Sequence, residues 1–199
     1  MVRADATLNR QRLVLAVRDA VAEEGPGVSV RDIADRAGVG VTTLYRHFPS
    51  KQALLDAPSI DRWATLARLA GQAVAGRGSL PEIVDVLDGL TRMVSTDRGF
   101  IAALDLEVGH TPSTIRPWKH RFDRHLAALW VAAQRRGELR RYADPHDVVE
   151  LAGMIRDPRR RERMMLTLVN GICAEGVDTE RLLRRRSDTA MWRAVLRSL

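Results

Sequence analysis

Two short helical patterns separated by a glycine turn, within Ser29–Lys51, constrain the fold of this chain more than any other stretch. The apolar residues of the first pattern recur at the spacing of one helical face. They are Val30, Ile33, Ala34 and Ala37. Ser29 stands at the N-cap position, and Gly38 can adopt the left-handed backbone that ends a helix. The second pattern runs over residues 41–48, so the stretch predicts a helix-turn-helix over residues 29–48.

The rest of the chain shows helical periodicity without strand signals. Its 199 residues are 45% hydrophobic, which is ample material for a core. A first helix is predicted over residues 8–24, where Gly25-Pro26-Gly27 ends it, and residues 1–7 are predicted to be a disordered arm. We therefore predict an all-α protein that begins with a three-helix unit.

Charge points to a polyanionic partner only through its local arrangement. The formal net charge is +7, but much of the excess lies in residues 156–163, far along the chain from the helix-turn-helix. The stretch from Arg36 to Leu55 contains no acidic residue while it carries Arg36, Arg46 and Lys51. This stretch, rather than the overall basicity, favours nucleic-acid binding.

Cysteine usage and hydropathy favour a cytoplasmic protein. The single cysteine, Cys173, excludes an internal disulfide and fits a reducing compartment. The longest apolar run, residues 126–133, is far shorter than the ~20 residues that a membrane span requires. Polar residues at 9–12 interrupt any apolar signal sequence.

Residues from about 9 to 57 resemble the DNA-binding domain of the TetR family of bacterial transcriptional regulators. The resemblance rests on three runs: Ser29-Val30-Arg31-Asp32-Ile33-Ala34, Ala37-Gly38-Val39, and Thr43-Leu44-Tyr45-Arg46-His47-Phe48-Pro49-Ser50-Lys51-Gln52-Ala53-Leu54-Leu55. It implies an N-terminal DNA-binding domain at 1–57 and a larger helical ligand-binding and dimerisation domain at 58–199.

The resemblance implies that residues 41–47 enter the major groove. The DNA-binding residues are then Ser29, Arg31, Gly40, Val41, Thr42, Thr43, Tyr45, Arg46, His47 and Lys51. Base contacts are expected within residues 40–43, while Tyr45, His47 and Lys51 match phosphate-binding positions. Two alternatives stay open: the Tyr45 ring packs on the first helix, or the two threonines merely face solvent. Many relatives carry a capping serine where this chain has glycine at position 40.

A fourth helix is predicted to begin at Lys51 with Ser50 as its cap. Pro58 lacks a backbone N–H and clashes with the preceding turn, so a break or kink is expected near Ala57. The resemblance makes this point a candidate hinge between the two domains. Alternatively, Ser59 caps a separate helix.

Helices are predicted beyond this point over residues 59–74, 79–90, 97–108 and 113–136. Their large apolar residues are candidates to line a ligand cavity. These candidates are Trp63, Met93, Phe100, Leu104, Trp118, Phe122 and Trp130. Each of them is individually explained as well by core packing. His110, His120 and His125 lack metal-ligand spacing, so no metal site is predicted.

Further helices are predicted over residues 145–156, 158–175 and 178–198. The resemblance assigns the first two of these to a four-helix dimer interface. The second would begin at Asp157-Pro158, followed at once by an arginine cluster at 159–163. Such cations at a helix N-terminus are unfavourable, so they are expected to have acidic partners or to face water, with a second nucleic-acid patch as the alternative.

The resemblance implies a homodimeric transcriptional regulator, most often a repressor, that binds a palindromic DNA operator and responds to a small-molecule effector. The alternative is a DNA-binding structural or division-control factor of the same fold without such a ligand. No catalytic motif or cofactor-binding pattern occurs at a convincing spacing, so neither an enzyme nor a cofactor is predicted.

Overall fold

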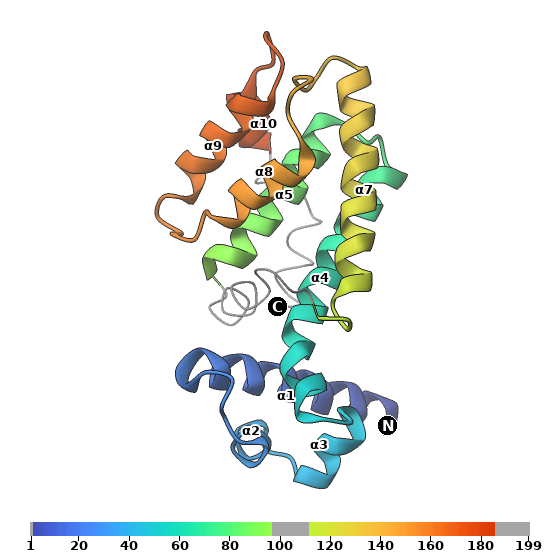
Figure 1. Cartoon of the computed structure of the whole chain (residues 1–199), viewed down its shortest axis with the longest axis vertical. Helices are drawn as coiled ribbons and strands as arrows, with labels where there is room; N and C mark the ends of the chain where they lie inside the picture. Colours follow the sequence, from blue (N-terminus) through green and yellow to red (C-terminus); the bar gives the residue numbers. More distant parts are fainter. Residues whose placement is uncertain (1, 97–111, 186–199) are drawn as a thin grey trace. The chain divides into compact units, whose positions relative to one another are not determined.

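The computed structural model describes residues 2–96 and 112–185. These residues form helices and no β-strand, which confirms the all-α class. The helices divide between two compact units (Figure 1). The N-terminal unit holds the described residues up to 62 together with 112–116. The C-terminal unit holds residues 63–96 and 117–185.

Among its described residues, the N-terminal unit is formed by α1 (Val2–Glu24), α2 (Val30–Ala37), α3 (Val41–His47) and the start of α4 (Lys51–Ala75). The predicted disordered arm at residues 1–7 is wrong, because α1 already begins at Val2. Its buried residues Leu13 and Val17 lie in the same apolar core as Ile33 of α2 and Leu44 of α3. The first helix therefore braces the helix-turn-helix through a shared core.

The start of α4 is fixed to the N-terminal unit by partly buried polar contacts. The Asp56 carboxylate, which is 6% exposed, accepts hydrogen bonds from Gln52 Nε2 at 2.7 Å and from Thr114 Oγ1 at 2.6 Å. Asp61 forms a bidentate pair with Arg10 of α1, with both N–O distances at 3.0 Å. These contacts anchor both α1 and the segment before α7 to the same stretch of α4.

The helix α4 continues through Pro58, so a break near Ala57 is wrong, and so is the alternative of a separate helix capped by Ser59. Ser59 is instead buried inside the helix, at 2% exposure. Buried residues lie on both sides of the proline, including Leu54 and Trp63. Their burial offsets the cost of the backbone hydrogen bond that a proline cannot donate.

The described residues of the C-terminal unit form the rest of α4, then α5 (Leu80–Thr96), α7 (Arg116–Arg135), α8 (Pro145–Gly153), α9 (Arg161–Ile172) and α10 (Thr179–Arg185). In this unit α5 packs against α8, α9 and α10. The start of α5 carries a capping-box contact, since the Glu82 carboxylate accepts hydrogen bonds from the Ser79 backbone N–H and, at 2.6 Å, from Ser79 Oγ. The helix predicted over 97–108 lies outside the described residues, as does the end of the helix predicted over 178–198.

The start of α9 differs from the prediction. Asp157 Oδ1 accepts a hydrogen bond from the Arg159 N–H at 2.9 Å, which stabilises a turn, and the helix begins only at Arg161. Arg161 reaches a buried acidic partner, Asp88 of α5, whose carboxylate also accepts a hydrogen bond from Arg92 Nε at 2.7 Å. The expected acidic partner therefore exists for Arg161, whereas Arg159 is exposed.

The connection from α7 to α8 is held against the end of α9. Leu139 and Cys173 form an isolated antiparallel bridge, and Arg140 N donates to Ile172 O at 2.9 Å. Cys173 is 2% exposed at this bridge, and burial raises the pKa of its thiol to about 11. Trp130 Nε1 donates to Ala143 O at 2.7 Å, which fixes the same connection to α7.

Candidate nucleic-acid interface

The predicted caps position α2 and α3. Ser29 Oγ accepts a hydrogen bond from the Asp32 N–H at 3.1 Å and donates one to Asp32 Oδ2 at 2.6 Å. Gly38 ends α2 with φ +66° and ψ +35°, the left-handed conformation that favours glycine. The chain then turns at Gly40, which has extended backbone and no capping side chain, and enters α3.

The helix α3 has one buried side and one exposed side. Leu44 is fully buried and Phe48, the residue after the helix, is 5% exposed. Next to Leu44 on the helix surface, Val41 is 38% exposed, and Tyr45 is 47% exposed. Thr42 and Arg46, on the side away from Leu44, are also exposed, which leaves this side of α3 open to a partner.

The remaining predicted DNA-binding residues flank this surface. Ser29 and Arg31 are exposed at the start of α2, and Thr43 and His47 are half-buried on α3. Lys51 Nζ donates a hydrogen bond to Gly27 O at 3.2 Å, so the ammonium group lies beside the start of α2. The structure thereby brings the predicted anchors of α2 and α4 to one edge of the motif.

Two contributions to this surface escaped the sequence analysis. Arg36, which the acid-free run counted as a free cation, pairs with Glu23 at 2.7 Å and also with Glu24. Its charge is therefore balanced by α1. Arg10 lies with its guanidinium carbon 5.6 Å from the Phe48 ring centroid, and its pair with Asp61 ties the end of α3 to α1 and α4. Neither pairing has a local sequence signal, because the partners lie on different helices.

The predicted ligand-cavity residues take different places in the C-terminal unit. Four are buried: Trp63, Met93, Phe122 and Trp130, with the Trp63 and Phe122 ring centroids 5.7 Å apart. Trp118 is half-buried at a groove between α4 and α7. Phe100 and Leu104 lie outside the described residues. Across the described ranges, no three His, Cys, Asp or Glu side chains form a group suited to a metal ion.

No helix in the described part of the chain has the length and hydrophobicity needed to cross a membrane. The exposed surface of α3 over a core shared by three helices defines a helix-turn-helix fold of the kind found in proteins that regulate transcription.

Comparison with known proteins agrees with this class. Residues 15–57 match the model for bacterial regulatory proteins of the tetR family. The crystal structure of a TetR transcription regulatory protein from Mycobacterium vanbaalenii is 32% identical, with a TM-score of 0.63, and the match covers 87% of this chain and 100% of that one. The chain therefore belongs to the TetR family of transcriptional regulators.

Two further relatives are similar over nearly the whole chain. The HTH-type transcriptional regulator UidR of Escherichia coli strain K12 is 24% identical over 98% of this chain and 94% of its own length. The crystal structure of a gamma-butyrolactone receptor described as ArpA-like is 25% identical, with a TM-score of 0.71, over 93% of this chain and 100% of that one.

Proposed function

We propose that this regulator is a ligand-responsive repressor that binds a palindromic DNA operator as a homodimer. The observation that carries the proposal is the two-sided α3, with Leu44 buried beneath exposed Val41, Thr42 and Tyr45. Inserted into the major groove, residues 40–43 would meet base edges, with the Val41 side chain against a thymine methyl group. Two copies related by a two-fold axis would read two half-sites.

The phosphate contacts in this proposal come from the edges of the motif. Tyr45 and His47 of α3 supply neutral donors, while Arg46 and Lys51 supply positive charge. Ser29 and Arg31 approach a phosphate from the start of α2, where backbone N–H groups favour an anion. In this proposal residues 1–57 form the DNA-binding domain and residues 58–199 form the regulatory domain.

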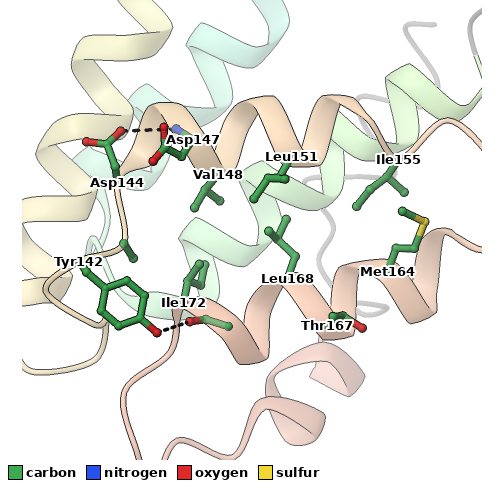
Figure 2. Close-up of a pocket in the computed structure, with 12 residues that line it drawn as sticks. Tyr142, Asp144, Asp147, Val148, Leu151, Ile155, Met164, Thr167, Leu168 and Ile172 are labelled. Carbon is green, nitrogen blue, oxygen red and sulfur yellow. Dashed lines mark hydrogen bonds between the residues drawn. The ribbon is translucent and has the colours of Figure 1, made fainter.

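An apolar groove between α8 and α9 supports the proposed dimer. Figure 2 shows Val148 and Leu151 of α8, and Ile155 just after it, facing Leu168 and Ile172 of α9 across this groove, which has a volume of about 500 Å³. At its rim Leu151 is 52% exposed and Tyr142 is 76% exposed. Such exposed apolar surface on late helices is suited to pairing with a second copy.

The response to a ligand is supported by the similarity to a protein named as a receptor for a small molecule, gamma-butyrolactone. Ligand would favour a dimer geometry whose two α3 helices no longer match the half-site spacing, so operator affinity would fall. The second candidate function, a DNA-binding structural factor without a ligand, predicts that no small molecule changes operator affinity.

The experiment begins with selection of bound fragments from random DNA, followed by affinity measurements on the selected operator. Lys51→Ala should weaken binding roughly ten-fold at low salt, because each subunit loses a phosphate contact, and the slope of log K against log salt should fall by about one per subunit. Tyr45→Phe should weaken binding about five-fold through loss of a neutral hydrogen bond, with little change in the salt slope.

The matched control is Lys119→Ala, which removes the only other lysine of the chain. Lys119 belongs to α7, where it pairs with Asp123 at 3.4 Å. Its loss should leave both operator affinity and salt slope unchanged. Equal effects of the two lysine substitutions, or wild-type binding by both Lys51→Ala and Tyr45→Phe, would refute the proposed docking.

A further inference from the structure

A groove between α4 and α7 lies within the C-terminal unit and has a volume of about 620 Å³. The two helices line it with different kinds of residue. The α4 side is made largely of small residues, namely Ala64, Ala67, Gly71 and Ala75. The α7 side presents Trp118, Arg121 and His125, which follow one another at the spacing of a single helical face.

The small residues of α4 create the space that the large residues of α7 overhang. A Cβ atom at Gly71 would lie 2.6 Å from Cε1 of His125 and 2.7 Å from its Nδ1. The imidazole therefore packs directly on the glycine backbone. A larger residue at this position would push the ring out of place and narrow the groove.

The groove is cationic, and none of the described residues that line it is acidic. Arg68 of α4 lines the groove, and it donates a long hydrogen bond, at 3.4 Å, to the Gln72 side chain. Arg121 on the opposite side is exposed and has no acidic partner in the described ranges. Two arginines thus approach one concave surface with their charges uncompensated.

The surroundings of His125 show the same excess of positive charge. Its Nδ1 atom is buried without a hydrogen-bond partner. Burial lowers the pKa of the His125 imidazole, and the positive charges of Arg121 and Arg124 lower it further. Arg68 adds a third positive charge from α4. An anion placed here would satisfy the arginines and relieve this repulsion.

We propose that the groove between α4 and α7 binds a small organic anion, a carboxylate on a flat apolar body. The carboxylate pairs with Arg121 and Arg68, which offer the planar donor forks that suit it. The apolar body lies against Trp118 and the small residues of α4. The volume falls within the range of small-molecule sites in proteins.

This site differs from the apolar cavity predicted from the sequence, with which it shares only Trp118. The proposal that the groove binds an anion does not depend on any effect on DNA. The further idea that an effector acts through this groove rests on the proposed function. The helix α4 contributes residues both to this groove and to the N-terminal unit, so it is the element through which binding would influence the operator complex.

The test uses 2-naphthoate as the probe and its neutral isostere 2-naphthamide as the comparison, each titrated into the full-length protein by calorimetry. Saturable binding of naphthoate, at least ten-fold tighter than that of the amide, is expected. Arg121→Gln should weaken naphthoate binding about ten-fold. Arg135→Gln removes the same charge from an exposed position of α7 outside the groove, and it should leave binding within two-fold of wild type.

A second readout follows the His125 imidazole by NMR. Bound naphthoate should raise the pKa of this imidazole, because the carboxylate offsets the field of the arginines, whereas the amide should not. The proposal is overturned by absence of saturable naphthoate binding, by equal binding of the amide, by equal loss in Arg135→Gln, or by an unchanged His125 pKa at saturation.

Operator binding is measured on the same samples, which separates this inference from the proposed function. Failure to bind naphthoate in protein that still binds its operator contradicts the groove alone. Saturable, Arg121-dependent binding that leaves operator affinity unchanged supports the proposed anion site. It also shows that this site is not where an effector controls DNA binding. Failure of operator binding with intact naphthoate binding contradicts the proposed function alone.

Discussion

At the scale of single residues, two glycines of the helix-turn-helix face open space but differ in backbone. A Cβ at Gly38 or at Gly40 would meet no heavy atom within 4 Å. Gly38 has φ +66°, whereas Gly40 has φ −70° and extended ψ. Only the first therefore requires glycine for the fold, and the second is free to serve another purpose.

This difference yields a paired prediction. Gly38→Ala should lower the free energy of unfolding by about 1 kcal/mol, because an L-residue is strained in the left-handed region. Gly40→Ala should change it by less than about 0.5 kcal/mol, since its backbone suits any residue. Urea denaturation followed by circular dichroism measures both.

Operator affinity then separates the roles of the two glycines. If the backbone at Gly40 approaches DNA closely, Gly40→Ala should weaken operator binding although the protein remains as stable as wild type. A stable Gly40→Ala protein with unchanged affinity would argue against close approach at this position.

At the scale of elements, the helix ends were predictable from the sequence where capping residues next to them set those ends. The ends of α2 follow from Ser29 and Gly38, and the capping box at Ser79 marks the start of α5. The continuity of α4 was not predictable, because local propensity at Pro58 favours a break and only burial of distant parts of the helix outweighs it. Whether this point acts as a hinge stays a prediction.

Pairs between elements had no signal in the sequence for the same reason. Arg36 and Glu23 are ordinary surface residues until α1 and α2 pack, and Asp88 meets Arg161 only because α5 packs against α9. The candidate interface was predictable as a set of residues on α3, whereas its electrostatic balance depended on these contacts.

The pair between α5 and α9 should matter far more for stability than an exposed pair. Asp88 is fully buried and Arg161 is 14% exposed. Asp88→Ala leaves Arg161 without its charge partner and should cost about 3 kcal/mol in the free energy of unfolding.

Asp19→Ala is the matched control, since Asp19 pairs with Arg18 at 3.1 Å on the surface with its side chain 58% exposed. It should cost less than about 0.5 kcal/mol. Chemical denaturation of both variants gives the comparison, and equal losses would show that the buried pair does not hold α9 to α5.

At the scale of the whole molecule, the proposed repressor depends on association of two chains. Leu151→Glu places a charge in the exposed apolar rim of the groove between α8 and α9, and it should shift the dimer toward monomer. Sedimentation velocity at micromolar concentration measures the change. Because Leu151 is already 52% exposed, the fold itself should survive.

The control is Val131→Glu on α7, where the side chain is 46% exposed. It should leave the association state unchanged. A Leu151→Glu protein that remains dimeric would assign the interface to another surface, and operator affinity should then also resemble wild type.

The bridge between Leu139 and Cys173 has a consequence for oxidant sensing. Cys173 is the only cysteine of the chain, and with a pKa of about 11 its thiol is almost wholly protonated at neutral pH. The thiolate is the nucleophile that attacks peroxides and disulfides. Oxidation of Cys173 therefore requires the end of α9 to open first. The folded regulator should not respond to oxidants through this thiol.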